Sequence, residues 1–383
     1  MAEQFEESIA NKEDELRRKI LWAVGAVIIG LVILRISCPA ISSHLPFGPS
    51  TRTLLARQVD AYDPTHDGKR IALLSGGILK SISSNGDGIR DLGNRPIIIP
   101  GYEWAEVRWS GDDSKIAVGT YYKKGNSPLM IFDLAAGTSQ EIARALSLGS
   151  FVWFGGSDQL AWIQHDAVSS ERHRRRKSSI FFWNKIGRPR AVYGDQHSGS
   201  SGISRLKYIP HTGNMGFIEN RFSVEALVKE QPLDRIRIIR PDGTEVRAIK
   251  PPPGRFRPPG AEFRSWDVSS IAKQIAHNYG WGIWVTSLES GAQPRRIAVG
   301  FPFEMCWSPD GKKLAFVTTS PNSPTPGIGA IAQGPPHELH VINKDGSGHR
   351  LVCTEPQGIK SIEWLNNNEL LYLSGKDLIR RKL

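Results

Sequence analysis

One short segment of the chain concentrates positive charge. Residues 171–177 place five permanent positive charges within six positions. The charged residues are Arg172, Arg174, Arg175, Arg176 and Lys177. Guanidinium and ammonium groups attract phosphates and carboxylates, so the pattern predicts binding of an anionic partner. A solvated loop without a ligand is the competing interpretation.

Motifs of the common catalytic centres are missing from the sequence. It has no Gly-x-Ser-x-Gly nucleophile motif, no His-Glu-x-x-His zinc motif and no paired Cys-x-x-Cys. The ten histidines are dispersed, and His337 and His340, three apart on a predicted strand, point to opposite faces. We therefore predict no cofactor and no resident metal. A site assembled from several distant segments leaves no local motif and stays an alternative.

An apolar segment near the amino terminus predicts a membrane anchor. Residues 20–34 are all apolar or glycine, and residues 36–38 extend the segment beyond Arg35 to about the length of a transmembrane helix. The segment is apolar on all sides, whereas a core helix would keep a polar face. We predict an uncleaved anchor over residues 20–38. A cleaved signal peptide is the main alternative, and Arg35 disfavours a lipidation signal at Cys38.

The flanking charges predict the orientation of the anchor. Basic residues 17–19 adjoin one end, whereas the other end has only Arg35 before Arg52. The positive-inside rule then places the amino terminus in the cytoplasm and the rest of the chain outside, in the periplasm or the extracellular space. Residues 1–19 form a short charged cytoplasmic tail. Residues 39–50, rich in Pro, Ser and Gly, are typical of a linker.

A repeated pattern occupies residues 51–383. In its clearest copy, residues 307–316, a strand ends at Trp307, a Pro-Asp-Gly turn follows, and a second alternating strand begins. The seven copies start at Tyr62, Trp109, Trp153, Tyr208, Trp266, Trp307 and Trp364. Two further short strands joined by a Gly-containing turn follow each copy except the last. Each unit is therefore predicted to be four strands joined by turns.

The spacing of the copies predicts a propeller. Successive copies lie 41 to 58 residues apart, and propeller blades take about 40–50 residues, so the longer units carry insertions. A four-stranded blade cannot bury both of its faces alone, so blades pack radially around an axis. We predict an all-β fold of seven four-stranded blades preceded by one transmembrane helix. Six blades are the alternative, because the copies at Tyr208 and Trp266 lack the Asp-Gly turn.

The repeat resembles that of the TolB-like propeller family, a relative of the WD-repeat propellers. Residues 307–316 are close to that family's Trp-Ser-Pro-Asp-Gly-x-x-Leu-Ala-Phe element, and the copy at Trp109 is also similar. The resemblance covers roughly residues 51–383. It implies a propeller that engages other proteins, but it specifies fold better than function, because propellers support unrelated activities.

Ring closure and the core can also be predicted from the repeat. The last unit is one strand short, and residues 51–59 are expected to supply its outer strand, which leaves no open sheet edge. We expect the five tryptophans at the repeat position, and also Trp281 and Trp284, to lie in the core. Cys306 and Cys353 fall on the first and fourth strands of one unit and are expected to be buried free thiols.

The predicted topology gathers the long insertions on one face. Connections from the second to the third strand of a blade, and from one blade to the next, leave from the same face. The insertions on such connections are residues 121–128, 165–178, 219–234, 250–262 and 318–337. Long loops on a rigid scaffold commonly carry binding sites. The candidate partner-binding residues are therefore the basic run of residues 172–177 together with Lys123, Lys124, Arg255 and Arg257.

The charge balance agrees with an anionic partner. The chain has 49 Lys and Arg against 38 Asp and Glu, a formal net charge of +11. Nucleic acid is disfavoured, because a propeller outside the cytoplasm rarely meets it. An envelope protein, an anionic lipid or an envelope polymer fits better. We predict a non-catalytic interaction or scaffold module. The alternatives are a hydrolase or lyase with a metal or polar site in the central channel, and a sensor signalling through the anchor.

Overall fold

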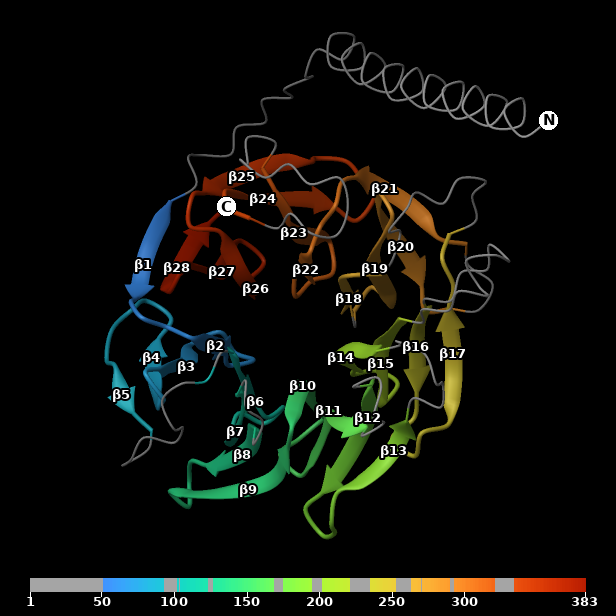
Figure 1. The fold of residues 1–383 in the computed structure, drawn as a ribbon. Helices are drawn as coiled ribbons and strands as arrows, with labels where there is room; N and C mark the ends of the chain where they lie inside the picture. Colours follow the sequence, from blue (N-terminus) through green and yellow to red (C-terminus); the bar gives the residue numbers. More distant parts are fainter. Residues whose placement is uncertain are drawn as a thin grey trace, which may run out of the picture. The chain divides into compact units, whose positions relative to one another are not determined.

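The repeat region folds into a ring of seven four-stranded sheets (Figure 1). The computed structural model describes residues 51–92, 102, 104–122, 127–168, 175–194, 202–220, 235–252, 263–269, 271–289, 293–320 and 334–383, without the side chains of 166–168, 175–177 and 220. The predicted tail, anchor and linker lie outside these residues. In the part of the chain that is described, no helix is long and apolar enough to span a membrane.

Each sheet is one blade, and its strands follow one another from the centre of the ring outward. Blades 1 to 3 comprise β2 (Ala61–Pro64), β3 (Arg70–Ser75), β4 (Ile78–Ser83) and β5 (Arg90–Asp91); β6 (Trp104–Trp109), β7 (Lys115–Tyr121), β8 (Ser127–Asp133) and β9 (Thr138–Ala145); and β10 (Ser147–Trp153), β11 (Gln159–Val168), β12 (Arg175–Asn184) and β13 (Arg190–Gly194). Blades 4 and 5 comprise β14 (Gly202–Ile209), β15 (Asn214–Asn220), β16 (Arg235–Ile239) and β17 (Glu245–Ile249); and β18 (Trp266–Ser269), β19 (Gln274–Tyr279), β20 (Gly282–Ser287) and β21 (Arg295–Val299). Blade 6 comprises β22 (Glu304–Trp307), β23 (Lys313–Thr319), β24 (His337–Asn343) and β25 (Arg350–Glu355).

Blade 7 is built from both ends of the repeat region. Its strands β26 (Ile359–Asn366), β27 (Glu369–Ser374) and β28 (Asp377–Lys382) are completed by β1 (Arg52–Ala56), which pairs antiparallel with β28. Figure 1 shows the blue β1 beside the red β28. The predicted closure by residues 51–59 is confirmed. The six-bladed alternative is wrong, because the copies at Tyr208 and Trp266 build complete blades without the Asp-Gly turn.

The repeat turn owes its shape to local side-chain hydrogen bonds. Between β22 and β23, Ser308 Oγ donates to Asp310 Oδ1 at 2.7 Å and accepts from the backbone N–H of Lys313 at 2.9 Å. Gly311 has φ +67°, a left-handed conformation that glycine adopts without a steric penalty. The Ser-Pro-Asp-Gly sequence therefore fixes a tight connection between the first and second strands of the blade.

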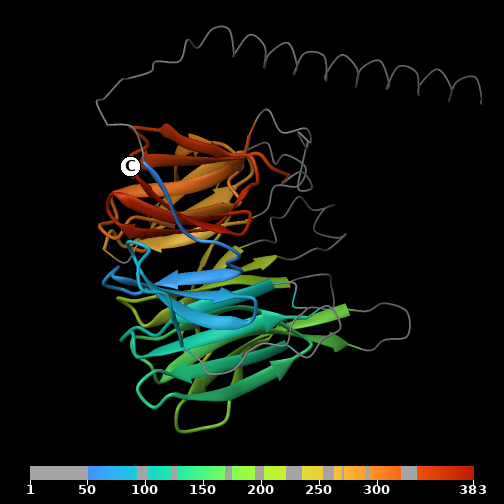
Figure 2. The same cartoon turned by 90° about the vertical axis from the view of Figure 1, so that its left-hand side faces the viewer.

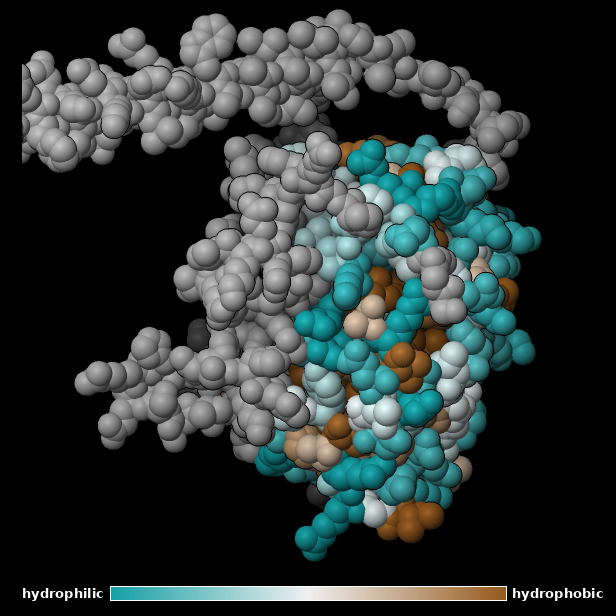
Figure 3. Space-filling view, turned by 90° about the vertical axis from the view of Figure 1, so that its right-hand side faces the viewer, coloured by the Kyte–Doolittle hydropathy of each residue, from teal (hydrophilic) through white to brown (hydrophobic). Residues whose placement is uncertain are grey.

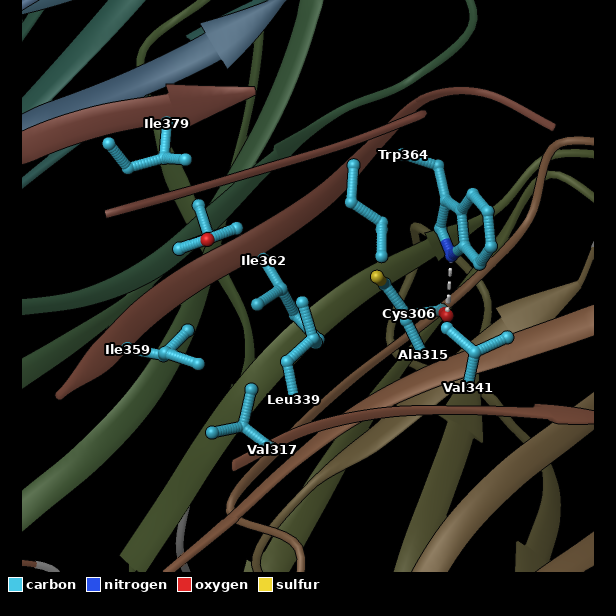
Figure 4. Packing of buried hydrophobic residues seen from close by; sticks show 11 residues of the cluster. Cys306, Ala315, Val317, Leu339, Val341, Ile359, Ile362, Trp364 and Ile379 are labelled. Carbon is cyan, nitrogen blue, oxygen red and sulfur yellow. Dashed lines mark hydrogen bonds between the residues drawn. The ribbon is translucent and has the colours of Figure 1, made fainter. Parts of the chain in front are cut away.

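The hydrophobic core lies between blades. Seven clusters of buried residues each join two neighbouring blades, and they include both faces of every sheet. Figure 4 shows the cluster between blades 6 and 7, in which Val317 and Leu339 of blade 6 pack against Ile359 and Ile379 of blade 7. Alternation along each strand supplies apolar side chains to both neighbours. This packing explains why a single blade is not stable alone.

The repeat tryptophans are buried, and the repeat aromatic residues of five blades form a hydrogen bond with the preceding blade. All five repeat tryptophans are at most 7% exposed, as predicted. Side chains of five blades donate a hydrogen bond to a backbone carbonyl on the inner strand of the preceding blade. The pairs are Tyr62 with Ser361, Trp109 with Asp63, Trp153 with Arg108, Trp266 with Arg205, and Trp364 with Cys306 (Figure 4). The recurrence of an aromatic residue at this position thus reflects both packing and hydrogen bonding.

Three expectations need correction. Trp281 is 53% exposed, because it lies in the turn between β19 and β20, and Trp284 is only partly buried. Cys306 is a buried free thiol, but the free thiol of Cys353, on an outer strand, is only partly buried. The insertion predicted over residues 165–178 is shorter than expected, because β11 runs to Val168 and β12 starts at Arg175.

Candidate functional site in the central channel

The inner strands of all seven blades line a cavity at the centre of the ring. Its volume is about 810 Å³, which is within the range of small-molecule pockets. Side chains of β2, β6, β10, β14, β18, β22 and β26 contribute to the lining. Figure 1 looks along this axis, with the seven inner strands arranged around it. We call the cavity the channel.

Arg108 is the centre of a charged cluster in the channel. Its Nη1 lies 2.9 Å from Asp63 Oδ1 and 3.1 Å from Glu363 Oε1, and its Nε lies 3.0 Å from Glu106 Oε1. These side chains come from β2, β6 and β26, so the cluster joins three successive blades. We call Asp63, Glu106, Arg108 and Glu363 the Arg108 cluster.

Two further ion pairs lie in the channel. Lys207 Nζ of β14 is 2.7 Å from Asp267 Oδ1 of β18. Arg205 Nη1, also of β14, is 3.7 Å from Glu304 Oε1 of β22, and Arg205 Nη2 donates to the carbonyl of Phe303 at 3.2 Å. Both pairs connect different blades, so channel electrostatics and ring assembly depend on the same residues.

Asp63 and Asp267 have equivalent positions in their blades, and each binds the same two kinds of partner, a channel cation and a backbone N–H group. Each directly follows a repeat aromatic residue in the sequence. One oxygen of each accepts a bond from a channel cation, and the other accepts from the backbone N–H of the next blade's tryptophan, Trp109 or Trp307, at 2.7 Å. These two carboxylates therefore have a structural role in blade attachment, and Asp267 also lines the channel.

Backbone bulges shape part of the channel wall. β14 and β26 each lose register with the second strand of their blade, and the bulges contain Arg205 at φ 57° and Ser361 at φ 51°. Residues other than glycine rarely adopt this conformation. The bulges turn the carbonyls of both residues towards the aromatic donors of the next blades, Trp266 and Tyr62. The strain is thus offset by the contacts between blades.

Burial and crowding shift the proton affinities of the Arg108 cluster. Burial, assisted by the nearby Glu363 charge and opposed by Arg108, raises the pKa of Asp63 to about 7. Burial also raises the pKa of Glu106, although Arg108 opposes it. Burial would lower the pKa of Arg108, but the surrounding carboxylates outweigh it and raise that pKa well above its usual range. One guanidinium cannot neutralise three carboxylates, so the cluster takes up a proton near neutral pH.

The two buried carboxyl groups of the cluster differ in their hydrogen bonding. Both oxygens of Asp63 accept hydrogen bonds, from Arg108 and from the N–H of Trp109. Glu106 Oε2, by contrast, is buried and has no hydrogen-bond partner among the described residues. Asp63, with a pKa of about 7, can exchange a proton near neutral pH, so this cluster is the described charged cluster best suited to acid–base chemistry.

The channel carries an excess of acidic groups. Its lining contains four carboxylates, those of Glu106, Asp267, Glu304 and Glu363, and three cations, those of Arg108, Arg205 and Lys207. This leaves one net negative charge when every one of these groups is ionised. Among the described residues, no three His, Cys, Asp or Glu side chains converge as metal ligands would.

The predicted basic surface falls largely outside the described residues. Lys123, Lys124, Arg172, Arg174, Arg255 and Arg257 are not described. The backbones of Arg175, Arg176 and Lys177 are described and form the start of β12, opposite Val168, Ala167 and Asp166 of β11. These three residues were predicted in a loop; the β-ladder continues further than the polar sequence suggested. The described part of the chain does not bring the predicted basic residues together in one site.

The long connections do begin and end at one edge of the ring. Figure 2, a side view, shows the strands running between the two edges. Because the strands are antiparallel, the ends of β7, β11, β15 and β23 share an edge with the ends of β17 and the starts of the inner strands. The outer side of the ring in Figure 3 is mainly hydrophilic, with its hydrophobic residues dispersed.

Sequence reasoning missed the channel residues. Asp63, Arg108 and Glu363 lie far apart in the chain and form no motif. One signal was present: a charged residue directly follows the repeat aromatic in only two copies, as Tyr62-Asp63 and Trp266-Asp267. An acid in this otherwise apolar or small position marks a side chain placed between blades at the channel.

Comparisons with known proteins agree with the fold. No family model matches the chain, and no curated protein matches it. An oligogalacturonate lyase solved in complex with manganese superposes with a TM-score of 0.59 at 14% identity over 87% of this chain and 90% of that one. The oligogalacturonate lyase of Vibrio parahaemolyticus gives 0.57 at 14% identity, with the same coverage. A chain of the mitotic checkpoint complex gives 0.56 at 12% identity over 90% of this chain and 98% of that one. At these identities the comparisons show the fold alone: a seven-bladed propeller similar to those of oligogalacturonate lyases and WD40-type proteins.

Proposed function

We propose that this protein is a membrane-anchored, extracytoplasmic propeller that acts by binding a partner in the cell envelope and not by catalysis. The observation that carries the proposal is the placement of its long connections. The four long connections within blades and the one between blades 4 and 5 all depart from strand ends at one edge of the ring. Loops on one edge of a rigid scaffold form a continuous recognition surface.

The sequence supplies the chemistry of that surface. The connections at this edge contain the basic residues around Lys123, Arg174 and Arg255. Their charge suits an acidic protein, an anionic lipid or an anionic polymer. The TolB-like form of residues 307–316 supports an interaction module, and residues 20–38 supply the anchor.

Photo-crosslinking in intact cells tests the proposal. A photoreactive amino acid replaces Lys124, Arg174 or Arg255 at the long-connection edge, and Ala135 or Ile186 in turns at the opposite edge. Ile186 is 97% exposed, so its side chain is open to a partner. We expect partner adducts from the first set only. Adducts that form equally from both edges, or only from the turns, would overturn the proposal.

Anionic vesicles provide the second arm of the test. The combined Arg174→Glu, Arg175→Glu and Arg176→Glu substitutions reverse three charges of the basic run. If a lipid is the partner, the intact protein binds vesicles with anionic lipid more strongly than neutral ones, and the substituted protein loses that preference. If adducts form with a protein and vesicle binding does not change, the partner is the protein.

An enzyme is the second candidate function, supported by the channel. The cavity of about 810 Å³ is lined by Arg108, and Asp63, which accepts a hydrogen bond from Arg108, has a pKa of about 7; this pair could provide acid–base catalysis. Two of the structural neighbours are oligogalacturonate lyases, one of them with manganese. Incubation with oligogalacturonate and Mn²⁺, followed by ultraviolet absorbance of an unsaturated product, tests this candidate. Product formation that Asp63→Asn abolishes would favour the enzyme.

A further inference from the structure

The channel has the opposite charge character from the whole protein. The chain carries a formal charge of +11, yet the channel lining has four carboxylates against three cations. A basic protein that keeps a locally acidic cavity presents cationic ligands with a distinct site. This feature is independent of the basic connections and of the predicted anchor.

The Arg108 cluster is short of hydrogen-bond donors. Its three carboxylates provide six oxygens, and Arg108 and the Trp109 N–H satisfy only some of them. Glu106 Oε2 is buried and without a partner among the described residues. The side chain of Glu363 is 33% exposed and lines the cavity. Any guest that brings N–H donors and positive charge completes this arrangement.

An exposed tryptophan lies beside the cluster. Trp104 starts β6, is 43% exposed and lines the same cavity. Residues 104, 106 and 108 alternate along one strand, so their side chains share one face of β6. A cation placed over an indole ring is attracted by the negative face of the ring. An open aromatic face beside unsatisfied carboxylates is therefore suited to a cationic group.

We propose that the channel binds an organic cation, an ammonium or guanidinium group, between Trp104, Glu106 and Glu363. Such a group satisfies separate carboxylates through separate N–H bonds while its flat or alkyl part covers the indole. A metal ion instead needs several ligands directed at one point, and no three such ligands converge in the described residues. The cation is either a free small molecule or a Lys or Arg side chain of a partner.

Isothermal titration of the full-length protein in detergent tests the proposal. The probes are agmatine, as a free cation, and the blocked tripeptide Gly-Arg-Gly, as a side-chain source. The blocked peptide Gly-citrulline-Gly is the neutral control, because its urea group keeps the shape of guanidinium without the charge. We expect agmatine or the arginine peptide to bind and the citrulline peptide not to bind. Binding of the peptide alone would assign the site to a partner side chain.

Two substitutions locate the site. Trp104→Leu and Glu363→Gln are each expected to weaken binding about tenfold. Both side chains are partly exposed, so these changes are compatible with folding, which circular dichroism checks. Trp281→Leu is the matched control: Trp281 is similarly exposed, at 53%, but is not part of the channel lining.

Three results would overturn the proposal. The first is that neither agmatine nor the arginine peptide binds up to about 10 mM. The second is that the citrulline peptide binds as strongly as the arginine peptide. The third is that Trp281→Leu weakens binding as much as Trp104→Leu does. Loss of partner crosslinks in the experiments on the long-connection edge would not affect these measurements. The two proposals therefore fail separately.

Discussion

Nε1 of Trp364 donates a hydrogen bond to the backbone carbonyl of Cys306, which lies 3.0 Å away in the preceding blade (Figure 4). Trp307 has the equivalent position in blade 6, but its buried Nε1 has no partner among the described residues. There the backbone N–H of Trp307 is held by Asp267 Oδ2 at 2.7 Å. Neighbouring blades are therefore fastened in different ways by the same repeat residue.

This difference predicts unequal effects of the same substitution. Trp364→Phe and Trp307→Phe remove similar apolar area from sites that are 7% and 6% exposed. Only the first also leaves a buried carbonyl without its donor. We expect Trp364→Phe to lower the free energy of unfolding by about 1–2 kcal/mol more than Trp307→Phe. Urea denaturation of the two full-length variants measures the difference, and equal losses would contradict the role of the indole bond.

The ring itself could be predicted from the sequence, because the sequence pattern that forms each blade is local and is repeated along the chain. Each aromatic start, turn and alternating strand pair lies within one stretch of chain, so periodicity shows the number of blades. Closure by β1 followed from the need to cover the last sheet edge. The continuation of β11 and β12 into the basic run was not predictable from side-chain polarity, since a two-stranded ladder protruding into solvent accepts charged residues on both faces.

The channel could not be predicted in the same way. Asp63 and Glu363 meet at Arg108 only because the first and last units of the repeat are neighbours in the closed ring. Their association is a consequence of closure, and no local pattern encodes it. The exposure of Trp281 has a similar explanation: it belongs to a turn and not to the repeated strand positions that pack between blades.

Close packing of a glycine predicts a sensitive position in blade 4. A Cβ atom on Gly216 would lie 2.4 Å from Cη2 of Trp266, whose side chain is 1% exposed and has no room to move. We expect Gly216→Ala to destabilise the protein by about 1–3 kcal/mol. Gly202→Ala in the same blade is the control, because no atom lies within 4 Å of the added methyl group. Thermal denaturation of both variants tests this; equal melting temperatures would contradict it.

A buried acid beside the closing strands, Glu355, predicts that one substitution strongly destabilises the protein and that a second substitution restores its stability. Glu355 of β25 accepts from Tyr372 Oη at 2.7 Å and from Ser374 Oγ at 2.8 Å, and lies 3.6 Å from Arg381 of β28. Glu355→Leu leaves the buried Arg381 without this carboxylate, at a cost of about 3–5 kcal/mol. Adding Arg381→Met is expected to restore most of the stability.

The partly exposed Arg52 provides the control for this closure network. Its Nε lies 3.4 Å from Glu355, but its side chain is 44% exposed, so Arg52→Ala is expected to cost less than about 1 kcal/mol. Chemical denaturation of the single and double variants measures these differences. A double variant no more stable than Glu355→Leu alone would show that Arg381 does not carry the effect.

The crowded carboxylates of the Arg108 cluster predict a pH-dependent loss of stability. The folded protein holds a proton here to higher pH than the unfolded chain does, because burial and the excess of carboxylates raise the pKa of Asp63 from 3.8 to about 7 and also raise that of Glu106. Between about pH 4 and 7 the folded state therefore binds more protons than the unfolded state does. Its stability is therefore greatest below pH 4 with respect to this cluster, and falls as the pH rises through 7.

Asp63→Asn separates this effect from all other titrations. The substitution removes the carboxyl group whose pKa burial raises to about 7, so the difference in unfolding free energy between variant and parent should change with pH. We expect the parent to lose up to about 1.4 kcal/mol per pH unit relative to the variant between pH 4 and 7. Glu289→Gln, at an exposed position outside the channel, should run parallel to the parent. Denaturation curves across this range decide the matter: parallel profiles for parent and Asp63→Asn would show that Arg108 keeps Asp63 ionised.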